Sequence, residues 1–111
     1  MIEKIILDFL NLKLDVKVYL EIPNNPDEKY VIIEKTGSGE SNHVKSATIA
    51  IQSYADSLYR AASLNEELKS TMEKAVELEQ ISKCKINSDY NYTDTSSKKY
   101  RYQAVYDITC F

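Results

Sequence analysis

The chain has 111 residues, of which 43 % are apolar and 28 % are charged, and its formal net charge is -3. This length suits one domain, so the sequence predicts a single domain over residues 1–111. The small negative charge disfavours direct binding to nucleic acid, and no apolar run approaches the roughly 20 residues needed to cross a membrane.

The first predicted element is an amphipathic helix over residues 2–13, where apolar residues recur at helical spacing. A strand over residues 16–22 follows, because apolar and polar side chains alternate there until Pro23 and the turn-rich "PNNPDE". The first ten residues contain two acids and no small-residue cleavage site, so they do not resemble a signal peptide. A cytosolic compartment is therefore expected.

Two further strands are predicted on either side of the only two glycines in the chain. Residues 29–36 form the first of these strands, and residues 43–55 form the second, with Ile49 and Ile51 on one face. The stretch "TGSGES" between them predicts a turn in which glycine supplies a positive φ.

A long helix is predicted to begin at Asp56 or Ser57, either of which suits the N-cap position, and to end near Gln80. One face of this helix is apolar apart from two polar interruptions, which predicts that it packs on the core. That face comprises Leu58, Ala61, Ala62, Asn65, Leu68, Met72, Ala75, Val76 and Glu79.

The last third of the chain predicts a hairpin of strands 84–92 and 100–110, joined by a polar connection. Even-numbered positions are the more apolar in both strands, so even residues are expected to pair with even residues. Cys84 and Cys110 lie on this face and are direct neighbours in one such register. A disulfide is geometrically possible, but free thiols are expected in a reducing cytosol.

The predicted order is helix, three strands, helix, two strands, without the alternation of strand and helix that builds a parallel sheet. The sequence therefore predicts an α+β fold. We expect a mostly antiparallel sheet of four to five strands with two helices packed on one face.

No motif assigns catalytic, cofactor-binding or metal-binding residues. A phosphate-binding P-loop needs a lysine after its last glycine and a following helix, but Gly39 is followed by Glu40 and then a strand. Ser41, His43 and Asp56 are the residue types of a hydrolase triad, but nothing in the sequence brings them together. One histidine and two distant cysteines are a weak metal-ligand set. A structural or interaction role is therefore favoured.

From Pro23 onward, the chain resembles the minor tail proteins of long-tailed phages. More specifically, it resembles the tail terminator, or tail completion, family of siphophages and their prophages. The matching features are the extended "YVIIEKTG" segment, the "ATIAIQSYADS" strand that enters a helix, the helix start "LYRAASLNEEL" and the closing hairpin. Ser38 separates the two glycines here, whereas relatives are expected to have adjacent glycines. Because of this difference, the resemblance does not fix the detailed geometry of the turn.

The resemblance implies a subunit that assembles as a hexameric ring, caps the tail tube, ends its polymerisation and joins tail to head. The implied partners are further copies of the chain, the tube protein and a head–tail connector or neck protein, with no cofactor. The implied location is the virion tail, after assembly in the host cytoplasm. The implied interface with neighbouring subunits or the tube is the tip of a β-arm, formed by Thr36, Gly37, Ser38, Gly39, Glu40 and Ser41.

Two alternatives stay open at this point. The first is another phage neck or tail component, such as a head-closure or tube protein with the same general α+β plan. The second is a small hydrolase or nucleotide-binding enzyme that uses Ser41 and His43, or the glycine-containing stretch.

Overall fold

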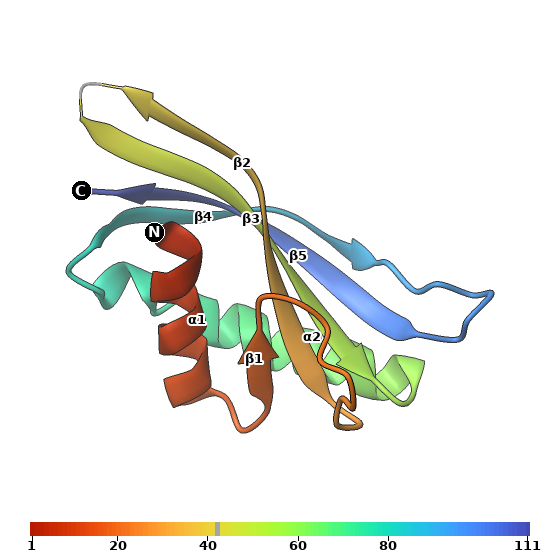
Figure 1. Cartoon of the computed structure of the whole chain (residues 1–111). Coiled ribbons are helices and arrows are strands. Elements are labelled where there is room, and N and C mark those ends of the chain that lie inside the picture. Colours follow the sequence, from red (N-terminus) through yellow and green to blue (C-terminus); the bar gives the residue numbers. More distant parts are fainter. Residues whose placement is uncertain (42) are drawn as a thin grey trace.

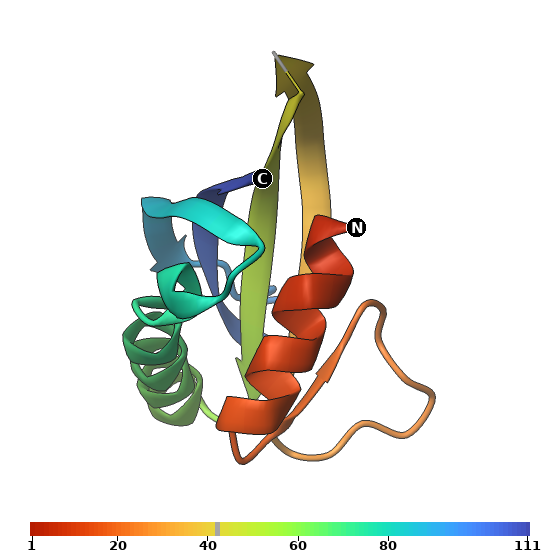
Figure 2. The same ribbon diagram turned by 90° about the vertical axis from the view of Figure 1, so that its left-hand side faces the viewer.

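The computed structural model describes residues 1–41 and 43–111 and has the predicted α+β fold (Figure 1). Five strands form one sheet in the order β1-β2-β3-β5-β4, and every neighbouring pair is antiparallel except β1 with β2. Both helices pack on the same face of the sheet (Figure 2). The elements are α1 (Ile2–Lys13), β1 (Lys17–Tyr19), β2 (Tyr30–Ser41), β3 (Val44–Ala55), α2 (Leu58–Met72), the 3-10 helix η1 (Ala75–Glu77), β4 (Ile81–Asn91) and β5 (Tyr100–Cys110).

The first helix has its predicted bounds, but the first strand is shorter than its sequence pattern. β1 ends at Tyr19 and pairs only with the first three residues of β2. Val18 is buried, whereas Leu20 and Ile22 are 43 % and 45 % exposed. The prediction of a strand over residues 16–22 is therefore wrong beyond Tyr19. Alternation describes which side chains are apolar, but a strand also needs a neighbour to accept its hydrogen bonds.

The second helix begins as expected and ends early. The Ser57 hydroxyl caps it by accepting a hydrogen bond from the backbone N–H of Arg60 at 3.2 Å. It ends at Met72 rather than near Gln80, and the chain continues through η1 into β4. Val76 is 49 % exposed as a result, although helical spacing placed it on the apolar stripe. The helix must stop here because β4 has to start on the sheet beside β5, which no local signal encodes.

A single main core lies between the helices and the sheet. Its fully buried side chains include Ile33 and Ile49 from the sheet and Leu64 and Leu68 from α2, each at most 2 % exposed. Burying a side chain of this size contributes about 1.5–3 kcal/mol each, so this layer supplies most of the apolar stabilisation. Leu64 is absent from the stripe predicted for this helix, since the helix turns Leu58 outward and centres its buried face on Leu64 and Leu68.

The closing hairpin has the expected strands but not the expected register. Asn87 is an extra residue between Ile86 and Ser88, where a β-bulge shifts the pairing with β5. Beyond the bulge, Asp89 lies opposite Ala104, so an odd residue of β4 pairs with an even residue of β5. The expectation that even residues pair with even residues throughout is therefore wrong. One inserted residue moves every later side chain to the other face of the sheet.

Candidate functional site

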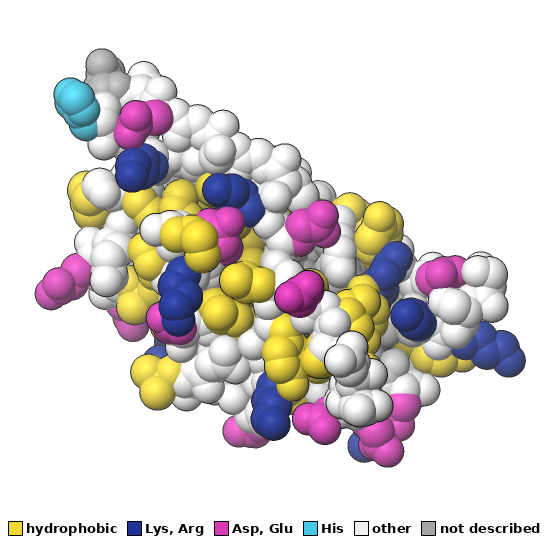
Figure 3. Space-filling view, viewed as in Figure 1, with side chains coloured by type: hydrophobic (Ala, Val, Ile, Leu, Met, Phe, Trp, Pro, Cys, Tyr) yellow, Lys and Arg dark blue, Asp and Glu magenta, His cyan; other side chains and the backbone are white. Residues whose placement is uncertain are grey.

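The most prominent surface feature is the end of the β2–β3 hairpin, which projects beyond both helices and both chain termini (Figure 2). We call its described residues, 36–41 and 43–48, the arm. Every arm residue of β2 is exposed, and the arm residues of β3 become buried only at Ala47. The arm is largely white in Figure 3, in keeping with its serines, threonines and glycines. It is therefore a polar, mostly solvent-facing extension of the sheet.

The two glycines lie inside β2 and not in a turn. Gly37 pairs with Thr48, and Gly39 pairs with Ser46. Neither glycine has a positive φ. The prediction that "TGSGES" is a turn with glycine at positive φ is therefore wrong. The strand continues through this stretch because β3 pairs with it all the way to Ser41.

The chain reverses direction further along, after Ser41. His43 has φ 66°, a left-handed conformation that suits a tight turn, and β3 begins at Val44. Thr36 to Ser41 therefore form one side of the arm, and its tip lies beyond them. Asn42 belongs to the predicted strand connection and lies outside the described residues.

Neither glycine is required by the packing of its own subunit. A Cβ atom built on Gly37 meets no atom within 4 Å, and one built on Gly39 meets only Ser46 Oγ, at 3.4 Å. A glycine inside a strand weakens it and commonly marks a place where another backbone or a ligand approaches closely. The two glycines also border a shallow hollow of about 410 Å³ on the face of the sheet away from the helices. On that face of the arm, β2 therefore has no side chain at these two positions, beside Thr48 and Ser46 of β3.

The outer edge of β2 is unpaired over most of its length. β1 covers only Tyr30 to Ile32, so Ile33 to Ser41 carry no neighbouring strand on that side. β4 forms the opposite edge of the sheet and is likewise unpaired on its outer side. Unpaired edges offer backbone N–H and C=O groups to another chain. Among the described residues, the chain therefore presents two such edges, at opposite sides of one sheet.

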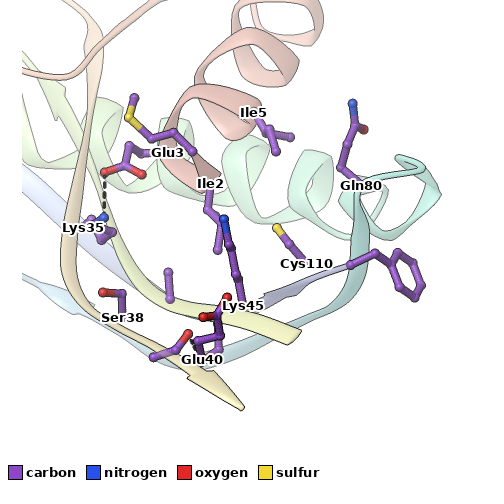
Figure 4. Close-up of a pocket in the computed structure, with 14 residues that line it drawn as sticks. Ile2, Glu3, Ile5, Lys35, Ser38, Glu40, Lys45, Gln80 and Cys110 are labelled. Atoms are coloured by element: carbon purple, nitrogen blue, oxygen red, sulfur yellow. Dashed lines mark hydrogen bonds and ion pairs between the residues drawn. The ribbon is translucent and has the colours of Figure 1, made fainter. Parts of the chain in front are cut away.

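A groove of about 710 Å³ separates the arm from the start of α1 (Figure 4). Lys35 reaches across it, and its Nζ lies 3.5 Å from Glu3 Oε2. The other carboxylate oxygen of Glu3 is buried without a hydrogen-bond partner. Lys45 also lines the groove, together with the exposed side chain of Phe111. The groove can thus accept a polar or mixed segment, and the ion pair of Lys35 with Glu3 joins β2 to α1 across it.

The uncovered face of the sheet carries a hydrogen-bonded polar network. Gln52 Nε2 donates to Gln103 Oε1 at 2.8 Å, and Gln103 Nε2 donates to the Tyr90 hydroxyl. The Tyr54 hydroxyl donates to Gln52 Oε1 at 3.2 Å and accepts from Arg101 at 2.8 Å. These contacts tie β3, β5 and β4 together at the end of the sheet opposite the arm. They give the sheet a rigid base from which the arm extends.

Tyrosine rings extend this network along the edge of the same face. Tyr30 stacks on Tyr54, with ring centroids 4.7 Å apart, and Tyr19 packs edge-on against Tyr30. Burial raises the pKa of Tyr30, and the neighbouring Tyr54 adds to this effect. Of the nine tyrosines of the chain, three are buried, namely Tyr30, Tyr54 and Tyr106.

A second polar contact, not foreseen from the sequence, joins α2 to β4. Asn65 is 1 % exposed and donates to Asp89 Oδ1 at 2.6 Å. Lys69 donates to Asp89 Oδ2 at 2.5 Å and lies 3.0 Å from Glu66. These hydrogen bonds, the one to Asp89 foremost, raise the pKa of Lys69. Asn65 was recognisable as a polar interruption of the stripe, but its partner depends on the bulge at Asn87.

The structure separates the residue types of the hydrolase alternative. Ser41 and His43 lie near the tip of the arm, and Asp56 follows the far end of β3. A strand of this length spans about 40 Å at about 3.3 Å per residue. Asp56 instead pairs with Arg60, at 2.9 Å. Within residues 1–41 and 43–111, no group of three or more His, Cys, Asp or Glu residues has the geometry of a metal site.

The two cysteines are free, and they are not opposite each other. Cys84 pairs with Ile108, two residues before Cys110. Cys110 pairs with Ile81, next to a second bulge between Ile81 and Lys83. The register that makes them direct neighbours is therefore wrong. Burial raises the pKa of Cys84 to about 11 and also raises the pKa of Cys110. Both sulfurs are thus kept as neutral thiols near pH 7.

The chain is an α+β protein defined by its projecting arm and its two unpaired sheet edges. None of the helices in the described part of the chain has the length and apolarity needed to cross a membrane. Neither a family model nor a curated protein sequence matches the chain.

Proposed function

We propose that the chain is a structural subunit of a long-tailed phage or prophage, which assembles as a ring, caps the tail tube and ends its polymerisation. The sequence resemblance to tail terminator proteins motivates this proposal, and the ring is expected to be a hexamer. Its proposed partners are other copies of the chain, the tube protein and a head–tail connector or neck protein. The proposed location is the virion tail.

The observation that carries the proposal is the arm with its free edge. A small domain gains little core from a long hairpin, and the exposed strand carries an aggregation risk. Such a feature is useful when a partner covers it in the assembled state. Gly37 and Gly39 support this reading, because nothing inside the subunit needs a glycine at either position.

The proposal is tested by removing the end of the arm without changing strand register. Residues 40–45 are deleted, and Gly39 is joined to its direct partner Ser46 through an Asn-Gly turn. We expect a folded protein, since the described residues of this segment are all exposed. In lysates of the phage that encodes the chain, we expect overlong or headless tails by electron microscopy.

A matched control shortens the hairpin at the opposite end of the sheet. Residues 95–98 are replaced by Asn-Gly between Asp94 and Lys99, which already pair with each other. This variant should support tails of normal length. Normal tails and full infectivity from the arm deletion would remove the proposed role of the arm. Binding of the native chain along the walls of purified tubes, and not at their ends, would favour another tail component over a terminator.

A further inference from the structure

Both unpaired edges lie on one sheet, and they run in opposite directions. β2 is antiparallel to β3, β3 to β5, and β5 to β4. β2 and β4 of one subunit therefore have opposite polarity. If a second copy is placed so that its β4 continues the sheet beyond β2, the two strands meet as an antiparallel pair.

The two edges also match in level over part of their length. Across the sheet, Ile33 is level with Asp89, through the pairs with Ile51 and Ala104. At the arm, Gly39 is level with Lys83, through Ser46 and Thr109. Glu40 is level with Ile81, through Lys45 and Cys110, so residues 33–40 of β2 lie at the level of residues 81–89 of β4. Beyond Asp89, Tyr90 and Asn91 of β4 reach the level at which β1 covers β2, so a strand from a second copy has to leave the sheet after Asp89.

One bulge of each edge strand falls at the same level. Thr36 is the extra residue of β2, next to Lys35, which pairs with Ile49. Asn87 is the extra residue of β4, next to Ile86, which pairs with Tyr106, the partner of Ile49. An unstaggered pairing of β2 with β4 from another copy therefore sets one bulge against the other, and the register is kept from Ile33 to Gly39. The second bulge of β4, between Ile81 and Lys83, lies at the end of this stretch.

The side chains fit in this arrangement as well. Gly37 is level with Lys85, and Gly39 is level with Lys83, all on the face away from the helices. The lysine stems of one copy can lie over the glycines of the next, where no side chain obstructs them. Pairing β4 with β4 of another copy would instead bring two lysine-bearing edges together, which like charges disfavour.

We infer that β2 of one copy pairs with β4 of the next, residues 33–40 against residues 81–89, so that the sheet continues from subunit to subunit. This inference rests on the proposed assembly role of the arm and names its partner as a second copy of the chain. The interface joins two different surfaces, so repetition produces a ring wherever the rotation between copies closes.

Cysteine cross-linking tests the register directly. Glu34 is level with Ser88, through Ala50 and Val105, so Glu34→Cys and Ser88→Cys are combined in a chain with both native cysteines changed to Ala. Within one subunit these positions are three strand spacings apart, about 14 Å, which is too far for a disulfide. Mild oxidation of concentrated protein should therefore give only interchain products, seen as a ladder on a non-reducing gel.

Two controls make the result specific. Glu34→Cys with Lys83→Cys uses an acceptor on the same face but about 17 Å along the strand, and should give little product. Glu34→Cys alone should give none, and a dimer from it would indicate β2 pairing with β2 and overturn the inference. No ladder from the first pair, or equal ladders from both pairs, would also overturn it. If the cysteine-free background does not fold, the pairs are made in the native background, with the native chain as the oxidation control.

The outcome is distinguishable from failure of the proposed function. A specific ladder from a chain that does not cap tubes would support the strand pairing and remove the tail role. Tube capping by a chain that gives no ladder would keep the tail role and remove this pairing.

Discussion

Asn65 of α2 donates a hydrogen bond to Asp89 of β4 at 2.6 Å, which connects the middle of the long helix to the edge strand of the sheet. Asn65 is almost completely buried, and its carbonyl oxygen has no partner. The contact therefore gives the buried amide nitrogen of Asn65 a hydrogen-bond partner, while the amide oxygen has none. It also fixes the position of β4, which has no strand on its outer side.

The first prediction concerns this contact. Asp89→Ala should lower the free energy of unfolding by about 1–3 kcal/mol, since it leaves the buried amide of Asn65 without any partner. Asn65→Leu should lower the free energy of unfolding by less, because it replaces the buried polar group by an apolar one of similar size. In this variant Asp89 keeps its hydrogen bond from Lys69. Urea denaturation measures both. A larger loss for Asn65→Leu than for Asp89→Ala would contradict this account.

The second prediction concerns the buried face of α2. Leu68 is 0 % exposed, so Leu68→Ala should lower the free energy of unfolding by about 2–5 kcal/mol through lost burial and the cavity left behind. Glu67, its neighbour on the exposed face, is the matched control. Glu67→Ala should change stability by less than about 0.5 kcal/mol. Equal shifts of the denaturation midpoints would mean that another face of the helix packs on the sheet.

The third prediction concerns the glycines of the arm. Gly37→Ala should raise the stability of the isolated chain by about 0.4–1 kcal/mol, because its backbone suits alanine and the site has room. Gly39→Ala should gain less, since its Cβ contacts Ser46. Thermal denaturation measures the change.

The same glycine variants separate stability from assembly. Larger side chains, as in Gly37→Leu, should leave the isolated chain folded but reduce the cross-linking between copies. Ser63→Leu, at an exposed position of α2 outside both edge strands, is a control that introduces the same side chain. A loss of folded structure in Gly37→Ala would show that the subunit itself needs glycine there.

The fourth prediction concerns the thiols and alkaline pH. Burial raises the pKa of Cys84 to about 11, above the value of about 8.5 for an exposed thiol. The unfolded chain therefore loses this proton first as pH rises. The stability that comes from keeping the thiol neutral is complete below about pH 8.5 and is lost as pH rises toward about 11. In Cys84→Ala, the free energy of unfolding should therefore fall less over this pH interval than in the native chain. Denaturation at a series of pH values measures the difference.

Thiol titration checks the redox state of the same residues. Protein prepared without oxidant and then unfolded should contain two reactive thiols, in agreement with the free cysteines of the structure. The folded protein should react slowly at pH 8, because both sulfurs are at least partly buried and keep their protons. A count of zero in freshly lysed cells would contradict a reduced state.

Sequence patterns predicted the elements whose stability is local or periodic. The helix over residues 2–13 follows from apolar spacing, and the start of α2 follows from Ser57 as its N-cap. β3 and β5 were predicted nearly to the residue, because both are central strands whose side chains alternate against a core on one face. The α+β class followed from the order of these elements.

The arm was only partly predictable. A long strand–glycine–strand stretch indicated a hairpin, but the glycines pointed to the wrong residues for its turn. Glycine is permissive at positive φ and is also acceptable in an extended strand, so its identity alone does not select between them. The two glycines are extended because they pair with Thr48 and Ser46, and the chain turns at His43 instead.

The sequence by itself determined the bounds of α1, the N-cap of α2, the central strands and the absence of any recognisable catalytic motif. Only the tertiary structure decided the short β1, the early end of α2, the bulged register of β4 and the pairing of Asn65 with Asp89. The physical reason is the range of the interactions. Periodicity and capping act over a few neighbouring residues, whereas strand ends and register depend on which distant backbone groups complete the hydrogen bonds.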